Sequence, residues 1–88
     1  MSKEIEAVIL LSVELGSEDA VLKRVSMKPG VRVVYEILGI YDITVFILAW
    51  SEEDLDRLIY KVSKADPRII GFTVLRIINK RLKILDMY

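Results

Sequence analysis

The sequence contains neither cysteine nor histidine. Without cysteine the chain has no disulfide, no thiolate nucleophile and no zinc–thiolate site. Without histidine it lacks both the usual acid–base group for catalysis near neutral pH and the commonest transition-metal ligand. Serine–histidine and cysteine–histidine catalysis are therefore excluded. We expect no catalytic residue, no metal site and no cofactor.

Long apolar runs and a net charge are also missing. The longest apolar runs, residues 7–11 and 45–50, are far too short to cross a bilayer, and the first four residues lack a signal-peptide profile. Thirteen basic and thirteen acidic residues give a formal net charge of +0, which disfavours charge-driven binding to nucleic acid. We expect a soluble, cytoplasmic protein that contacts neither membrane nor nucleic acid directly.

What remains is a small and very apolar chain of 88 residues, 53% of them hydrophobic. This length predicts one domain, residues 1–88, near the size at which a single core gives only modest stability. Burial against a partner would therefore stabilise it.

The first half of the chain alternates in a way that predicts two strands around a helix. Apolar residues occupy every odd position of 5–15, which indicates a strand with one apolar face. After Gly16, Ser17 is expected to cap a helix that ends by Pro29-Gly30. Alternation resumes over residues 31–38 and predicts a second strand.

The second half repeats this order. Residues 43–50 are apolar on both faces, as in a central strand. Ser51 and Asp54 resemble a capping box for a helix that ends near residues 65–67, and residues 69–79 predict a fourth strand. We expect residues 80–88, with the basic side chains of Lys80, Arg81 and Lys83, to add a short, solvated edge strand. The buried stripe of this second helix is expected to be Leu55, Leu58, Ile59 and Val62.

With right-handed crossovers this order gives an α+β fold, the ferredoxin-like βαββαβ arrangement: a four-stranded antiparallel sheet with both helices on one face. A contiguous apolar surface on the other face would mark an interface. We expect two sheets to pack face to face as a symmetric dimer, a dimeric α+β barrel. Strand alternation assigns six apolar residues to that second face: Val8, Leu10, Val34, Leu38, Phe46 and Leu48.

The break between the two middle strands is the best candidate site. Gly39 allows a positive φ and a close approach by another group, and Asp42 supplies a charged acceptor. Both residues are also common in ordinary turns. In the functional interpretation, Asp42 pairs with an ammonium group, backbone N–H groups near Gly39 hold a carboxylate, and the Tyr41 ring covers the ligand. A zwitterionic amino acid suits these partners.

Several segments together resemble the effector-binding (RAM) domain of the Lrp/AsnC family of transcription regulators. They are Pro29-Gly30-Val31, Tyr35, Gly39-Ile40-Tyr41-Asp42 and Ile43-Thr44-Val45-Phe46-Ile47. The resemblance implies dimers that assemble into rings, commonly octamers, with an amino acid or related metabolite in a cleft between neighbouring dimers. It also implies a ligand site whose residues are Gly39, Ile40, Tyr41, Asp42 and, on the last strand, Thr73.

Regulators of that family normally begin with a helix-turn-helix domain, whereas this chain enters its first strand almost at once. It resembles the stand-alone effector domains of the family, so we expect no DNA-binding domain. Such a domain is expected to respond to its ligand by changing assembly and to modulate transcription by joining rings of full-length relatives.

Two other classes of function stay open from the residues alone. Dimeric ferredoxin-like domains include small enzymes of the monooxygenase and isomerase type, although the nearly aliphatic odd-numbered faces leave few polar groups for such a site. The domain could also be an assembly module that binds no ligand, in which case no amino acid would change its melting temperature.

Overall fold

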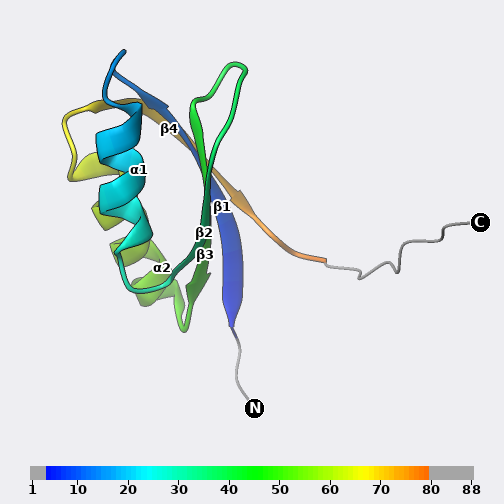
Figure 1. Ribbon diagram of the computed structural model, residues 1–88. Helices are drawn as coiled ribbons and strands as arrows, with labels where there is room; N and C mark the ends of the chain where they lie inside the picture. Colours follow the sequence, from blue (N-terminus) through cyan, green and yellow to red (C-terminus); the bar gives the residue numbers. More distant parts are fainter. Residues whose placement is uncertain (1–3, 80–88) are drawn as a thin grey trace, which may run out of the picture.

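The computed structural model describes residues 4–79, which form one antiparallel sheet covered on one face by helices (Figure 1). The strands lie in the order β2-β3-β1-β4, and every neighbouring pair is antiparallel. This is the expected ferredoxin-like arrangement, and the prediction of fold class is confirmed. In chain order the elements are β1 (Ile5–Val13), α1 (Glu18–Ser26), β2 (Val31–Glu36), β3 (Ile43–Ala49), α2 (Glu52–Ile59), the π-helical segment η1 (Tyr60–Lys64) and β4 (Ile69–Arg76).

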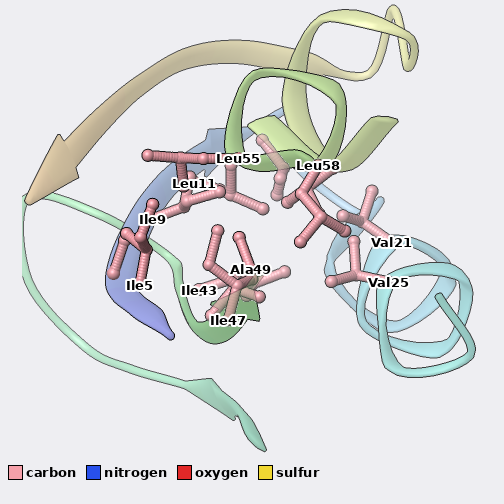
Figure 2. Packing of buried hydrophobic residues seen from close by; sticks show 14 residues of the cluster. Ile5, Ile9, Leu11, Val21, Val25, Ile43, Ile47, Ala49, Leu55 and Leu58 are labelled. Carbon is pink, nitrogen blue, oxygen red and sulfur yellow. The ribbon is translucent and has the colours of Figure 1, made fainter. Parts of the chain in front are cut away.

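The core lies between the sheet and the two helices (Figure 2). Odd-numbered residues of β1 and β3 point into it, and Ile9, Ile43 and Val45 are completely buried. The helices contribute the predicted apolar stripes, which remove aliphatic surface from water and so stabilise the fold. Their buried members are Val21 and Val25 of α1, Leu55 and Leu58 of α2, and Val62 of η1.

The two helices begin differently. Ser51 is extended, with φ −158° and ψ 170°, and its Oγ accepts a 3.0 Å hydrogen bond from the Asp54 N–H, as the capping-box prediction requires. Ser17 precedes α1, but its backbone is helical, with ψ 0°, and its side chain makes no capping hydrogen bond. The prediction that the Ser17 side chain caps α1 is therefore wrong, because its backbone is helical rather than extended as at a capping serine.

The strands are shorter than the alternation predicts. The strand β1 ends at Val13, before Leu15, and β2 ends at Glu36, before Leu38. Both leucines are essentially fully exposed, at 97% and 103%, since they lie in the connecting segments. The last two strands end at Ala49 and Arg76. The strand predicted for residues 80–88 lies outside the described residues.

A β-bulge in β2 changes which of its residues face the core. Val31 pairs with Ile47 and Val33 with Phe46, so Arg32 is an extra residue between them. Beyond the bulge Val34 packs against the core, and Val33 and Tyr35 take the opposite face. The assignment of Val34 and Leu38 to that face is wrong, since simple alternation does not allow for an inserted residue. The apolar residues of this face, here called the open face, are Val8, Leu10, Val33, Tyr35, Phe46, Leu48 and Leu75.

Close packing explains the glycine between α1 and β2. Gly30 has φ +90°, and a Cβ added there would lie 2.8 Å from Cδ1 of Leu58 and 3.2 Å from the carbonyl oxygen of Leu48. Only glycine meets both the conformational and the steric requirement. This turn therefore sets how closely α2 approaches the sheet.

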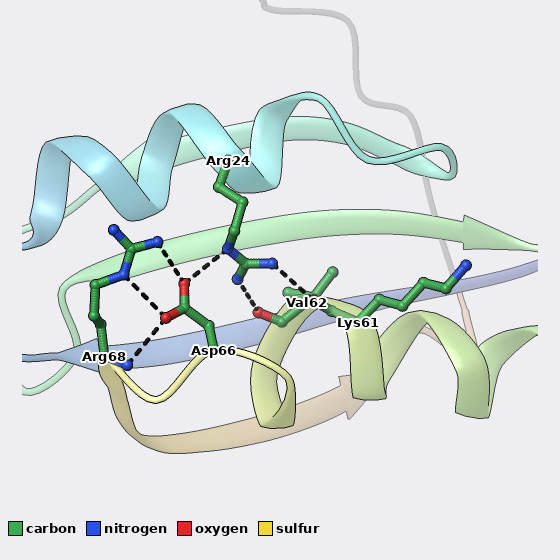
Figure 3. A network of polar contacts seen from close by, with 5 residues as sticks. All are labelled: Arg24, Lys61, Val62, Asp66 and Arg68. Atoms are coloured by element: carbon green, nitrogen blue, oxygen red, sulfur yellow. Dashed lines mark hydrogen bonds and ion pairs between the residues drawn. The ribbon is translucent and has the colours of Figure 1, made fainter.

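A buried carboxylate helps to tie α1 to the segment that follows α2 (Figure 3). Asp66 accepts two side-chain hydrogen bonds from Arg68, of 3.0 and 2.8 Å, and forms a 2.8 Å ion pair with Nε of Arg24. The Arg24 guanidinium also donates to the carbonyl oxygens of Lys61 and Val62, at 2.9 and 2.8 Å. One arginine of α1 thus holds the π-helical segment and the carboxylate that follows it.

Membrane insertion through a helix has no support in this fold. Among residues 4–79, no helix is long and apolar enough to cross a bilayer.

Candidate functional site

The connection between β2 and β3 forms a hairpin that projects beyond the end of the helical layer (Figure 1). It is closed by a 2.8 Å hydrogen bond from the Ile37 N–H to the carbonyl oxygen of Asp42. Leu38 and Ile40 at its tip are exposed to 103% and 91%. Two large aliphatic side chains on such a loop lose contact with water only when another molecule covers them.

Asp42 extends the pairing of β3 with β1 beyond the last pair of strand residues. Its N–H donates to the carbonyl oxygen of Leu11, and its Oδ2 accepts from the Val13 N–H, each at 2.8 Å. The carboxylate therefore replaces the backbone acceptor that a longer strand would supply to Val13. A carboxylate accepts several hydrogen bonds, so it can bind a cationic group while keeping this one.

Tyr41 and Thr73 meet although they are far apart in the sequence. Their hydroxyl groups are in hydrogen-bond contact. Thr73 of β4 pairs with Leu10 of β1, which places it on the open face. The hairpin therefore folds over the end of that face and brings a phenol and a threonine hydroxyl together.

The two remaining predicted residues lie at the hairpin tip. Gly39 does not have a positive φ, and in the described part of the chain that conformation occurs only at Gly16 and Gly30. Gly39 therefore does not use the conformational freedom that a glycine allows. A Cβ added to Gly39 would meet no atom within 4 Å, so the loop borders open space. The structure thus gathers Tyr41, Asp42 and Thr73 at one end of the sheet and leaves Gly39 and Ile40 exposed.

The chemistry of this end suits a small polar ligand. One carboxylate and two hydroxyls provide a charged acceptor and two groups that both donate and accept. Within residues 4–79, no three carboxylates come together in a way that would hold a metal ion. The acidic residues of α2, Glu52, Glu53 and Asp54, occupy its first turn, where they complement the helix dipole.

A hollow that the residue pattern does not reveal lies at the other end of the open face. It has a volume of about 310 Å³ and lies over the start of β1, the bulge of β2 and the second half of β3. Its ionic groups belong to Glu4, Glu6 and Arg32. Arg32 lies beside the hollow because of the bulge in β2, and the alternation of residues in the sequence does not show where a bulge occurs. The hollow is separate from the residues around Asp42.

Comparison with solved structures identifies proteins of the same fold. FFRP-DM1 is 27% identical to this chain with a TM-score of 0.80, and the match covers 84% of this chain and 99% of FFRP-DM1. AsnC of E. coli is 17% identical with a TM-score of 0.81, and the match covers 93% of this chain and 56% of AsnC. A feast or famine regulatory protein of M. tuberculosis, Rv3291c, was crystallised with L-methionine; it is 15% identical with a TM-score of 0.75, and the match covers 90% of this chain and 53% of that protein.

No protein-family model matches the chain, and no curated protein matches it in sequence. The similarity in structure nevertheless confirms the resemblance to Lrp/AsnC effector domains that the sequence indicates. One of the three, Rv3291c, is named as a regulatory protein, and none of the three is named as an enzyme. The chain matches FFRP-DM1 over almost its whole length and AsnC over little more than half. The same fold therefore makes up nearly all of FFRP-DM1 and about half of AsnC.

Proposed function

We propose that the chain is a cytoplasmic regulatory domain that binds an amino acid at the hairpin end of its sheet and responds through assembly. The observation that carries the proposal is the contact between the hydroxyl groups of Tyr41 and Thr73, since Asp42 follows Tyr41 directly in the chain. The family resemblance assigns these three residues to ligand binding. The methionine bound to a relative of the same fold supports an amino acid as the class of ligand.

Assembly provides the mechanism. The open face has exposed apolar residues, such as Tyr35 at 55% and Leu75 at 51%, and a second copy would cover them. The exposed hairpin tip would then contact a neighbouring dimer, and the ligand would lie in that contact. A ligand that touches two dimers stabilises their association by the free energy that the association adds to ligand binding.

The partners in this proposal are an amino acid, further copies of the chain in an octamer or similar ring, and full-length Lrp/AsnC regulators. The match to just over half of AsnC supports the last of these, because a domain of the same fold could take the place of the corresponding part of a longer protein. The domain would then affect transcription without binding DNA itself. A catalytic role is disfavoured because the inward face of the sheet is aliphatic.

Replacement of Asp42 by Asn tests the ligand site. Asn keeps an oxygen that can accept from the Val13 N–H but removes the charge that would pair with an ammonium group. Because charge-assisted hydrogen bonds contribute roughly 1.5–3 kcal/mol, we expect amino-acid binding to weaken about tenfold or more. Isothermal titration with each of the twenty amino acids measures this.

A matched control is Asp56→Asn, which removes one exposed carboxylate from α2. It should bind as the wild type does. Equal affinity of the Asp42→Asn variant and the wild type would refute the site, and failure of every amino acid to bind the wild type would leave an assembly module without a ligand. Asp42→Ala is a poorer probe, because it also leaves the Val13 N–H without its acceptor, at about 1–3 kcal/mol of stability.

A further inference from the structure

The hollow on the open face has the size of a small ligand. Its volume of about 310 Å³ is at the lower end of the range typical of small-molecule sites. Glu6 and Leu48 in its wall are paired across β1 and β3, so its floor is the sheet itself. Asp42 lies near Val13, at the opposite end of β1. The two places therefore cannot share one small ligand.

The bulge in β2 places a cationic residue, Arg32, beside this hollow. Val31 and Val34 both pack toward the core, so the two residues between them, Arg32 and Val33, lie on the open face. In an unbroken strand one of these two would point inward. β-Bulges often occur beside functional sites, where they redirect a side chain. Here the redirected side chain is a guanidinium.

The lining combines both signs of charge with an apolar wall. Arg32 offers a planar fork of donors that fits a carboxylate. Glu4 offers a carboxylate that attracts an ammonium group. The rest of the wall includes the side chains of Phe46, Leu48 and Ile77. A molecule with one carboxylate, one ammonium group and an apolar substituent complements all three parts.

We propose that this hollow, the Arg32 pocket, is a second binding site for a zwitterionic amino acid with an apolar side chain. The proposal rests on the proposed function, in that the domain responds to amino acids, but it uses different residues. The pocket is part of the open face, so a second copy packed on that face would enclose its ligand. Occupation of the pocket is therefore linked to dimer formation, whereas occupation of the Asp42 end is linked to contacts between dimers.

The test compares Arg32→Gln with Arg57→Gln in the full chain. Both variants replace an exposed arginine, but Arg57 lies on α2, where it pairs with Asp54. Titration with L-leucine, L-isoleucine and L-methionine should show about tenfold or greater weakening for Arg32→Gln, because a charge-assisted contact is lost, and none for Arg57→Gln. Methyl NMR locates the ligand independently, since signals of Leu48 and Ile77 should shift on binding.

The outcomes separate the two proposals. Binding that is lost in Arg32→Gln and kept in Asp42→Asn supports the Arg32 pocket and overturns the Asp42 site. In another outcome, binding is lost in Asp42→Asn but kept in Arg32→Gln, and the Leu48 and Ile77 signals do not shift. This outcome overturns the Arg32 pocket alone. Two binding events, each removed by one variant, support both sites. A wild type that binds none of the three at about 10 mM, weaker than any useful affinity, overturns the Arg32 pocket, whereas the Asp42 site is decided by the titrations with all twenty amino acids.

Discussion

Asp66 is the side chain on which the most contacts converge. Its carboxylate is 4% exposed and faces the guanidinium groups of Arg24 and Arg68. The hydrogen bonds from Arg68, strengthened by the charges of both arginines and opposed by burial, lower the pKa of Asp66 to about 2 from its ordinary 3.8. The folded state therefore holds the ionised form more strongly than the unfolded chain does.

This shift predicts a particular response to acid. The stabilisation is complete above the pKa of the unfolded chain and is lost as the pH falls from about 4 through the folded pKa of about 2. The difference corresponds to about 2 kcal/mol of the free energy of unfolding. Urea unfolding between pH 7 and pH 2 should show that Asp66→Asn is less stable than the wild type near neutrality and approaches it in acid.

The control is Asp19→Asn. Asp19 also pairs with a cation, Lys23, but its side chain is 80% exposed, so the variant should follow the wild-type curve. An Asp66→Asn variant that loses as much stability in acid as the wild type would show that other carboxylates cause the acid sensitivity.

The two helices differ in whether a serine side chain caps their first turn. Ser51 caps α2 through its Oγ, whereas Ser17 contributes no side-chain hydrogen bond to α1. Ser51→Ala should therefore lower the free energy of unfolding by about 1 kcal/mol, the usual effect of removing an N-cap. Ser17→Ala should change it by less than about 0.5 kcal/mol, the typical range for surface substitutions. Equal effects in denaturant titrations would contradict the difference in cap geometry.

Helices and strands could be predicted where the hydrophobic periodicity of the sequence is unbroken. Odd positions of β1 and β3 follow a period of two residues and are buried as expected. The stripe predicted for the second helix follows a period of 3.6 residues, and its members are buried except Ile59, which is partly buried. The strand ends were less predictable, because Leu15 and Leu38 continue the alternation after pairing has stopped. The bulge at Arg32 and the contacts of Arg24 with η1 were missed, since both depend on tertiary contacts that no local pattern encodes.

The contacts of the candidate site residues could not be predicted from the sequence. A turn signal and a family resemblance identify Tyr41, Asp42 and Thr73, but no local pattern shows that a tyrosine hydroxyl reaches a residue 32 positions away. Nor does the sequence reveal that the Asp42 carboxylate already holds the end of β1. The Arg32 pocket could not be predicted either, because it depends on the bulge in β2, which no local pattern encodes.

The molecule as a whole has one covered and one open sheet face, which predicts association. Leu75 of β4 lies on the open face opposite Val8 and is 51% exposed, so lysine can replace it without entering the core. Between two packed sheets, however, its charge would be desolvated. Sedimentation velocity should show Leu75→Lys dissociating at concentrations where the wild type is dimeric, with a dissociation constant higher by about a hundredfold.

Leu15→Lys is the matched control, since Leu15 is 97% exposed and lies outside the sheet. It should sediment as the wild type does. A monomeric wild type at micromolar concentration, or equal dissociation of both variants, would show that the open face is not the dimer interface.

The length of the central strand β1 bears on how many ligand molecules one chain could bind. Glu6 at one end lines the Arg32 pocket, and Val13 at the other donates to Asp42. Seven residues of extended chain separate them by about 23 Å, several times the length of an amino acid. The two proposed sites can therefore be filled at the same time, and the proposed octamer with both sites filled in every chain would hold sixteen ligands rather than eight.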